Sequence, residues 1–261
     1  MAEQSDTGRL QYDRLKEYEA TRQTELTELA EPYVYVTDLY GALLCRLVAV
    51  LGVVPPKGVQ DHVVRDLMAD AFDFLHESRS VLLKGKVDVA YPLIRRAYES
   101  ISLMVLCQLD EKYAAKWQSG KQIQNSVVRK ELSKHPMGES EKELKELYKF
   151  FSMASHPNRE LVSHRYLGDG NQSILGSVDK PNLVLIADYC MKHLILWFWY
   201  GAFSIYTYRE AVVKHDPGCI EAYHRASSEA PIVMKWLNSN YKNVLEEWKQ
   251  VMKDQPPPRF Q

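Results

Sequence analysis

The stretch of chain from position 150 to 166, FFSMASHPNRELVSHRY, holds the densest set of groups that could carry acid–base or phosphate chemistry. Its ionisable members are His156, Arg159, Glu160, His164 and Arg165. An arginine offers paired, charged donors that fit a phosphate, and a histidine can move a proton near neutral pH. Arg159 and His164 are therefore the candidate catalytic pair.

The same stretch allows other interpretations. Pro157 predicts a turn after His156, because proline fixes its own φ angle and restricts the residue before it. His156, Glu160 and His164 could bind a metal ion only on a helix that continued through Pro157, so we expect no metal and no other cofactor. His156 could also simply cap a helix, and Arg159 and His164 could be solvated surface residues.

A second polar feature interrupts an apolar helix predicted between about positions 88 and 109. Arg95, Glu99 and Ser102 are four and three residues apart, so they share one helical face. Most simply, Arg95 and Glu99 form a buried intrahelical ion pair that fixes helix packing. Alternatively, these three residues together with His156 form a polar cluster that supports a site.

The elements that carry these residues are predicted to be helices, because the apolar residues recur with helical spacing and no alternating strand pattern appears. The expected helices cover residues 8–29, 33–51, 59–84, 88–109, 139–154, 182–208, 220–228 and 231–252. A polar stretch from 110 to 134 has a weak point at Gly120. We therefore predict an all-α protein.

The domain organisation follows from the absence of a linker or an internal repeat. We expect a single helical-bundle domain in which N-terminal helices within residues 1–58 pack on a core of residues 59–210. C-terminal helices follow within residues 211–254, and a proline-rich tail of residues 255–261 is expected to be disordered.

Composition and missing motifs exclude several classes of function. The chain has 33 Lys and Arg residues against 34 Asp and Glu residues, which argues against a generally basic protein that binds duplex nucleic acid. It has no GxxxxGK[ST] or GxGxxG loop to hold a nucleotide phosphate, and no GxSxG nucleophile motif.

The cysteines and apolar runs bear on the compartment. Cys45, Cys107, Cys190 and Cys219 are far apart and show no zinc-binding spacing, so we expect reduced thiols. The apolar runs 41–54 and 194–208 are shorter than the roughly 20 residues that a spanning helix needs. The first residues are charged and unlike a signal peptide. We expect a cytoplasmic protein without a membrane span.

The sequence from Arg159 to His164, RELVSH, resembles the Arg-x4–6-His motif of the HEPN superfamily. Members are small all-α proteins, many of them metal-independent ribonucleases of toxin–antitoxin, CRISPR and antiviral systems. The resemblance implies an HEPN-like core and a site completed across a homodimer. It also implies that Arg159 binds and neutralises an RNA phosphate and that His164 acts as general acid or base.

Two further segments, YPLIRRAYES and YKFFSMASHP, look like a bacterial family of helical proteins of unknown function. That resemblance implies that Arg95, Glu99 and His156 meet in space. Two hypotheses follow. The first is an endoribonuclease of a bacterial stress or antiviral defence system, with an antitoxin or defence-system partner. The second is a non-catalytic interaction or anion-binding module of the same fold.

Overall fold

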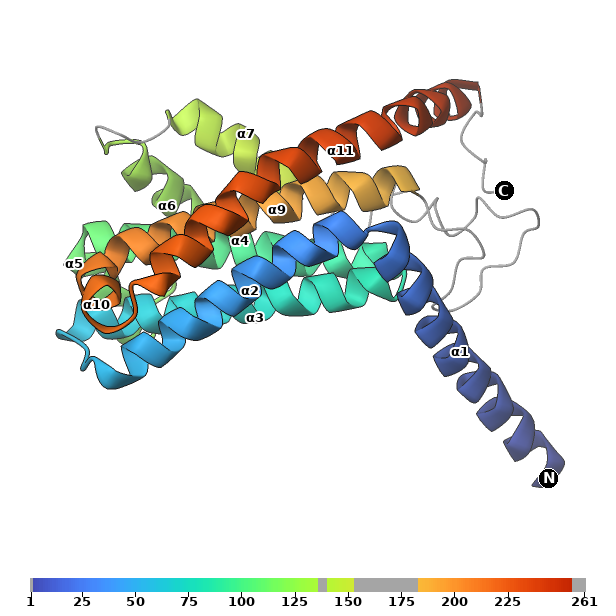
Figure 1. Ribbon diagram of the computed structural model, residues 1–261, viewed down its shortest axis with the longest axis horizontal. Coiled ribbons are helices and arrows are strands. Elements are labelled where there is room, and N and C mark those ends of the chain that lie inside the picture. The colour runs from blue at the N-terminus through green and yellow to red at the C-terminus, as the bar shows by residue number, and fades with distance from the viewer. Residues whose placement is uncertain (1, 136–139, 153–182, 255–261) are drawn as a thin grey trace.

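The computed structural model describes residues 2–135, 140–152 and 183–254, which form ten α-helices and no strand. The predicted all-α class is therefore confirmed. The first half of the chain contains α1 (Ala2–Leu29), α2 (Glu31–Val53), α3 (Val59–Leu83) and α4 (Val87–Leu109). Figure 1 shows α2, α3, α4 and α9 lying lengthwise in the bundle, from which the first part of α1 projects.

Local sequence accounts for the boundaries between these helices. Pro32 lies in the first turn of α2, where a missing backbone N–H costs nothing. Gly58 precedes α3 with a φ of 116°, and Gly85 separates α3 from α4 with a φ of 80°. Both angles lie in a region that glycine adopts without a steric penalty. The α3–α4 hairpin that results brings Asp70 and Ser100 together.

The polar stretch after α4 forms two short helices, α5 (Glu111–Gln118) and α6 (Asn125–Leu132), with Gly120 between them at a φ of 75°. Helix α7 (Glu141–Ser152) begins with a capping box. The Ser140 side chain accepts from the Glu143 backbone at 3.3 Å, and Glu143 accepts from the Ser140 backbone at 2.8 Å.

The C-terminal part contains α9 (Leu183–Thr207), α10 (Arg209–His215) and α11 (Gly218–Asp254). The expectation of separate helices over 220–228 and 231–252 was wrong, because α11 continues through Pro231. A buried stripe crosses the proline, formed by Ala226, Ala230, Val233 and Leu237. Burial of this stripe stabilises the continuous helix enough to offset the backbone hydrogen bond that proline cannot make.

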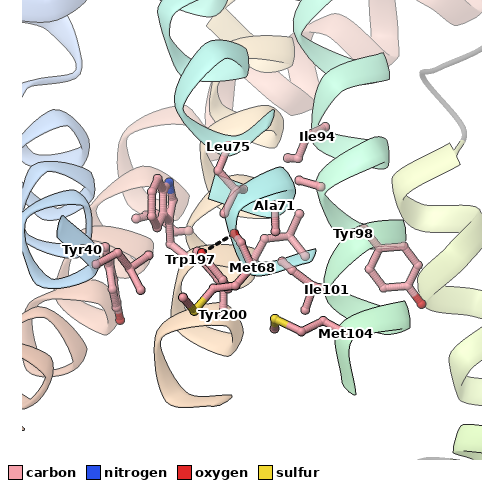
Figure 2. Packing of buried hydrophobic residues seen from close by; sticks show 14 of the residues in the cluster. Tyr40, Met68, Ala71, Leu75, Ile94, Tyr98, Ile101, Met104, Trp197 and Tyr200 are labelled. Atoms are coloured by element: carbon pink, nitrogen blue, oxygen red, sulfur yellow. Dashed lines mark hydrogen bonds between the residues drawn. The ribbon is translucent and has the colours of Figure 1, made fainter. Parts of the chain in front are cut away.

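The buried apolar residues form one core to which helices from both ends of the chain contribute. In Figure 2, Trp197 of α9 lies beside Tyr40 of α2, with their ring centroids 6.2 Å apart. The Tyr200 hydroxyl donates to the Met68 carbonyl of α3 at 2.5 Å. Helices α2, α3 and α9 therefore share one interior.

Within the described residues, α2 is the one helix that is long and apolar enough to cross a membrane. The core helix of a soluble protein meets the same criteria of length and composition. Tyr33, Val36, Tyr40, Leu43 and Leu47 of α2 are completely buried against the other helices. Its apolar character is thus accounted for by the bundle core.

Candidate functional site

The predicted site residues fall in two groups. Arg159, His164 and His156 lie outside the described residues. Arg95, Glu99 and Ser102 lie on α4 and are described. The geometry around α4 is therefore the starting point for the site.

Arg95 and Glu99 form an intrahelical ion pair. The Arg95 Nε atom is 3.0 Å from Glu99 Oε1, and the two side chains are only 22% and 16% exposed. Arg95 Nη2 also donates to the Tyr148 hydroxyl on α7 at 2.6 Å. The pair consequently connects α4 to the helix that directly precedes the stretch containing His156.

Two other polar residues of α4, Arg96 and Ser100, lie close to Asp70 of α3. Arg96 Nη2 is 3.9 Å from Asp70, and Arg96 Nη1 is 4.0 Å from Glu99. The Ser100 hydroxyl donates to the same Asp70 oxygen, Oδ2, that lies nearest to Arg96. We call this connected set the α4 polar cluster: Asp70, Arg95, Arg96, Glu99, Ser100 and Tyr148.

Sequence reasoning selected Ser102 but missed Ser100. Ser102 is half-buried and makes no hydrogen bond within the described part of the chain. Arg96 and Ser100 are four residues apart, so they share a face in the same way as Arg95 and Glu99. That spacing was a signal for a second polar stripe. Residue spacing could not show that Ser100 pairs with Asp70, because Asp70 lies on another helix.

Arg129 of α6 extends this arrangement. Its guanidinium lies 4.3 Å from the centroid of the Tyr148 ring, and its Nη1 atom is buried without a hydrogen-bond partner. The phenol ring of Tyr148 therefore has Arg129 against its face and Arg95 at its hydroxyl. The attraction between a cation and the ring face helps to hold α6 against α7.

A pocket of about 630 Å³ opens beside the α4 polar cluster, between α3, α4, α5 and the start of α6. Its apolar lining residues are Leu67, Leu103, Trp117 and Ile123. Its charged lining residues are Asp66, Asp70, Arg96, Glu99 and Lys121. We call it the α3–α6 pocket.

A second charged cluster joins α9 to α4 and α7. Lys192 is only 2% exposed, and its Nζ atom is 2.7 Å from Asp188 and 4.3 Å from the centroid of the Phe150 ring. The Tyr91 hydroxyl donates to the same Asp188 carboxylate. Burial, followed by the charge of Asp188, raises the pKa of Tyr91 well above its ordinary value of 10. Tyr91 thus stays protonated at neutral pH.

His193 is the buried histidine of α9. Its Nε2 atom lies 2.9 Å from the Leu75 carbonyl and its Nδ1 atom 2.7 Å from the Tyr33 hydroxyl. A neutral ring can satisfy both by donating from Nε2 and accepting at Nδ1. Burial lowers the pKa of His193 from 6.5 to about 3, so it does not exchange protons near neutral pH.

Among the described residues there is no group of metal ligands, and the three buried thiols are not activated. No three His, Cys, Asp or Glu side chains among them are grouped as metal ligands. Cys107, Cys190 and Cys219 are buried. Burial raises the pKa of Cys107 to about 12 and that of Cys219 to about 11, which keeps these thiols protonated and weakly nucleophilic.

Two further arginine–histidine pairs have the spacing of the candidate motif. Arg129 and His135 are separated by five residues, as are Arg209 and His215. Arg209 and His215 are the first and last residues of α10, and both are exposed. The exposed pair Arg209 and His215 is therefore a natural control for any role of Arg159 and His164.

The comparisons with known proteins add no relative. No family model, no curated protein and no solved structure matches this chain.

Proposed function

We propose that the protein is a metal-independent endoribonuclease that uses Arg159 and His164. The 2′-hydroxyl oxygen of RNA attacks the adjacent phosphorus, and the bond from phosphorus to the 5′-oxygen breaks. Arg159 neutralises the phosphate charge, and His164 either takes the proton of the 2′-hydroxyl or supplies one to the leaving 5′-oxygen. The products carry a 2′,3′-cyclic phosphate and a 5′-hydroxyl.

The observation that carries this proposal is the Arg-x4-His spacing in the chain that follows α7. The last turns of α7 are held firmly on α4. Arg95 binds the Tyr148 hydroxyl, and the Phe151 ring, fully buried, stacks on Tyr98 with centroids 4.8 Å apart. An anchored α7, which is separated from Arg159 by six residues of the sequence, is compatible with a catalytic role, because catalysis depends on positioning from a rigid element.

The proposed setting is the cytoplasm of a bacterium, in a stress or antiviral defence system. There the protein would act as a homodimer, with an antitoxin or another defence-system protein as partner. Support for this setting comes from the resemblance of the RELVSH motif to the HEPN ribonucleases.

The first test measures cleavage of single-stranded RNA by the purified protein with excess chelator. We expect cleavage to continue, because the mechanism needs no metal. The Arg159→Ala and His164→Ala variants should each lose at least a hundredfold in rate, since a positioned acid or base contributes about 10²–10⁴-fold. The product ends are identified by mass spectrometry.

The exposed pair Arg209 and His215 supplies a matched control. The double variant Arg209→Ala with His215→Ala removes the same residue types at a similar spacing. It should keep the wild-type cleavage rate, provided that circular dichroism shows an intact fold. Full activity in the Arg159→Ala, His164→Ala double variant would contradict the assignment.

A non-catalytic interaction module of the same fold is the second candidate. It is favoured by the pairing of charges in the α4 polar cluster, where Arg95 already binds Glu99 and Tyr148. That pairing gives Arg95 a structural role and disfavours its use as an anion site. Such a module would show no cleavage of any RNA at micromolar protein concentration.

A further inference from the structure

The α3–α6 pocket is lined both by paired charges and by polar side chains without a partner among the described residues. Among the paired charges, Asp70 accepts from Ser100, and Arg96 lies 3.9 Å from Asp70 and 4.0 Å from Glu99. The remaining polar side chains around the pocket make no hydrogen bond or ion pair with any described residue. They are Asp66, Lys121, Gln122, Gln124 and Asn125.

These unpaired groups face a space suited to a small molecule. A volume of about 630 Å³ lies within the range of roughly 300–1,000 Å³ that ligand sites occupy. Trp117, Leu103 and Ile123 give the pocket an apolar surface against which a flat ring can pack. Polar groups that are hydrated in the empty pocket can exchange water for a ligand without disturbing the fold.

The charges of the pocket indicate what the ligand offers. Its lining has three carboxylates, Asp66, Asp70 and Glu99, against two cations, Arg96 and Lys121. Arg95 neutralises Glu99 from outside the lining, and Arg96 lies near Asp70. The remaining carboxylate therefore favours a ligand group rich in hydrogen-bond donors. The Asp66 carboxylate is the acceptor without a partner, and a carboxylate can accept two parallel N–H bonds.

We propose that the α3–α6 pocket binds a guanine base. Guanine carries two adjacent donors, N1–H and the N2 amino group, which one carboxylate can accept together, and the exposed Asp66 carboxylate in the pocket lining would be that acceptor. Its O6 and N7 atoms accept from cations such as Arg96 or Lys121. Its ring packs on Trp117, as unpaired bases pack on aromatic side chains. Adenine, cytosine and uracil lack the two adjacent donors.

The guanine can come from either of two sources. It can be an unpaired base of the RNA substrate, in which case the inference rests on the proposed ribonuclease function. It can also belong to a free guanine nucleotide, whose phosphate would lie outside the pocket. The base contacts are the same in both cases.

The test is isothermal titration calorimetry of the full-length protein with guanosine, with adenosine as the control ligand. We expect guanosine to bind at least tenfold more tightly than adenosine. Asp66→Asn should reduce guanosine affinity at least tenfold, because the amide presents donors to donors. Glu77→Gln removes an exposed acid from the same helix outside the pocket and should leave the affinity unchanged.

Two substitutions of Trp117 distinguish a loss of base stacking from a loss of folding. Trp117→Ala should lose guanosine binding, whereas Trp117→Phe should retain most of it, since the ring face remains. Equal affinity for guanosine and adenosine, or wild-type affinity in Asp66→Asn, would overturn the proposal.

Two further ligands distinguish the two sources of guanine: GMP and a single-stranded RNA with one guanine. Both are titrated into the Arg159→Ala, His164→Ala double variant, so that the RNA is not cleaved. Tighter binding of this RNA than of its guanine-free counterpart supports the RNA source. Binding of GMP without that preference supports the free nucleotide. Guanosine binding without RNA cleavage would contradict only the ribonuclease function. Cleavage without guanosine binding would contradict only the pocket assignment.

Discussion

Lys192 and Arg95 are charged side chains that are largely withdrawn from water, and each has close partners. The Lys192 ammonium, 2% exposed, has Asp188 at 2.7 Å and the Phe150 ring against it. Arg95 has Glu99 and Tyr148. An unpaired charge in such surroundings would cost several kcal/mol, so each partner is needed by the other. A single substitution in either pair should therefore lower the free energy of unfolding.

Glu99→Ala should lower the free energy of unfolding by about 2–3 kcal/mol, because it leaves the Arg95 guanidinium poorly paired. Chemical denaturation measures the loss. Glu77→Ala on the exposed surface of α3 is the control and should change stability by less than about 0.5 kcal/mol. Adding Arg95→Met to Glu99→Ala should recover part of the loss, since an apolar pair can replace a buried ion pair. A Glu99→Ala variant as stable as wild type would contradict the structural role of the pair.

His193 should make stability depend on pH. Its pKa in the folded protein, about 3, lies below the ordinary value of 6.5, so the unfolded chain binds a proton that the folded one does not. The neutral ring contributes fully above about pH 6.5, and this contribution is lost as the pH falls towards 3. The slope reaches at most about 1.4 kcal/mol per pH unit.

The His193 contribution can be isolated by substitution. His193→Gln should be less stable at pH 7 but should show a flatter decline in unfolding free energy between pH 6.5 and 4.5 than wild type. His76→Gln, at an exposed position of α3, should retain the wild-type slope. Equal slopes in wild type and His193→Gln would mean that another group controls the decline.

Two kinds of contact fix how neighbouring helices meet. One is an arginine side chain that reaches the end of another helix, and the other is a glycine that lets two helices approach closely. Arg65 of α3 donates to the carbonyls of Leu51 and Val54 at 2.9 and 2.8 Å, which satisfies acceptors at the end of α2. At Gly201, α9 approaches α2 so closely that a Cβ atom would lie 3.2 Å from the Tyr40 ring. Helix ends and helix crossings are thus fixed by individual contacts.

Gly201→Val should destabilise the protein by about 1–3 kcal/mol, because the added side chain would push α9 away from the buried Tyr40 ring. Gly52→Val is the matched control on α2, where an added Cβ atom has no neighbour within 4 Å. Thermal denaturation of both variants measures the difference. If Gly201→Val melted at the same temperature as Gly52→Val, the close packing of α2 on α9 would be refuted.

At the scale of the whole molecule, the N-terminal region contains two unlike helices. Figure 1 shows the start of α1 projecting away from the bundle, and Tyr12 is 59% exposed. Helix α2, in contrast, contributes completely buried side chains such as Tyr33 and Tyr40 to the common core. Residues 59–210 by themselves would leave that surface uncovered.

Two truncations should therefore differ sharply. Removal of residues 1–14 should leave a folded protein with a cooperative thermal transition, because the start of α1 projects away from the bundle (Figure 1). Removal of residues 1–58 should give an unfolded or aggregating chain, since the apolar surface beneath α2 becomes exposed. Size-exclusion chromatography and thermal denaturation by circular dichroism distinguish the outcomes. A cooperative, monomeric 59–261 fragment would show that α2 is dispensable.

The sequence by itself determined the all-α class and most ends of the long helices, because these depend on local properties. It did not predict the short helices α5, α6 and α10. Apolar residues at helical spacing, Pro32, Gly58 and Gly85 act within a few residues of their own positions. The same logic placed Arg95 and Glu99 on one face, since a spacing of four residues is local. It failed at Pro231, where packing of neighbouring helices stabilises a continuous α11.

Only the tertiary structure decided which residues meet across helices. Asp70 with Ser100, Arg95 with Tyr148 and Lys192 with Phe150 lie far apart in the chain, and no spacing rule relates them. The α3–α6 pocket is of the same kind, because its walls come from separate helices whose crossing positions depend on side-chain fit throughout the core. Local sequence specifies what each helix presents, and packing specifies what it faces.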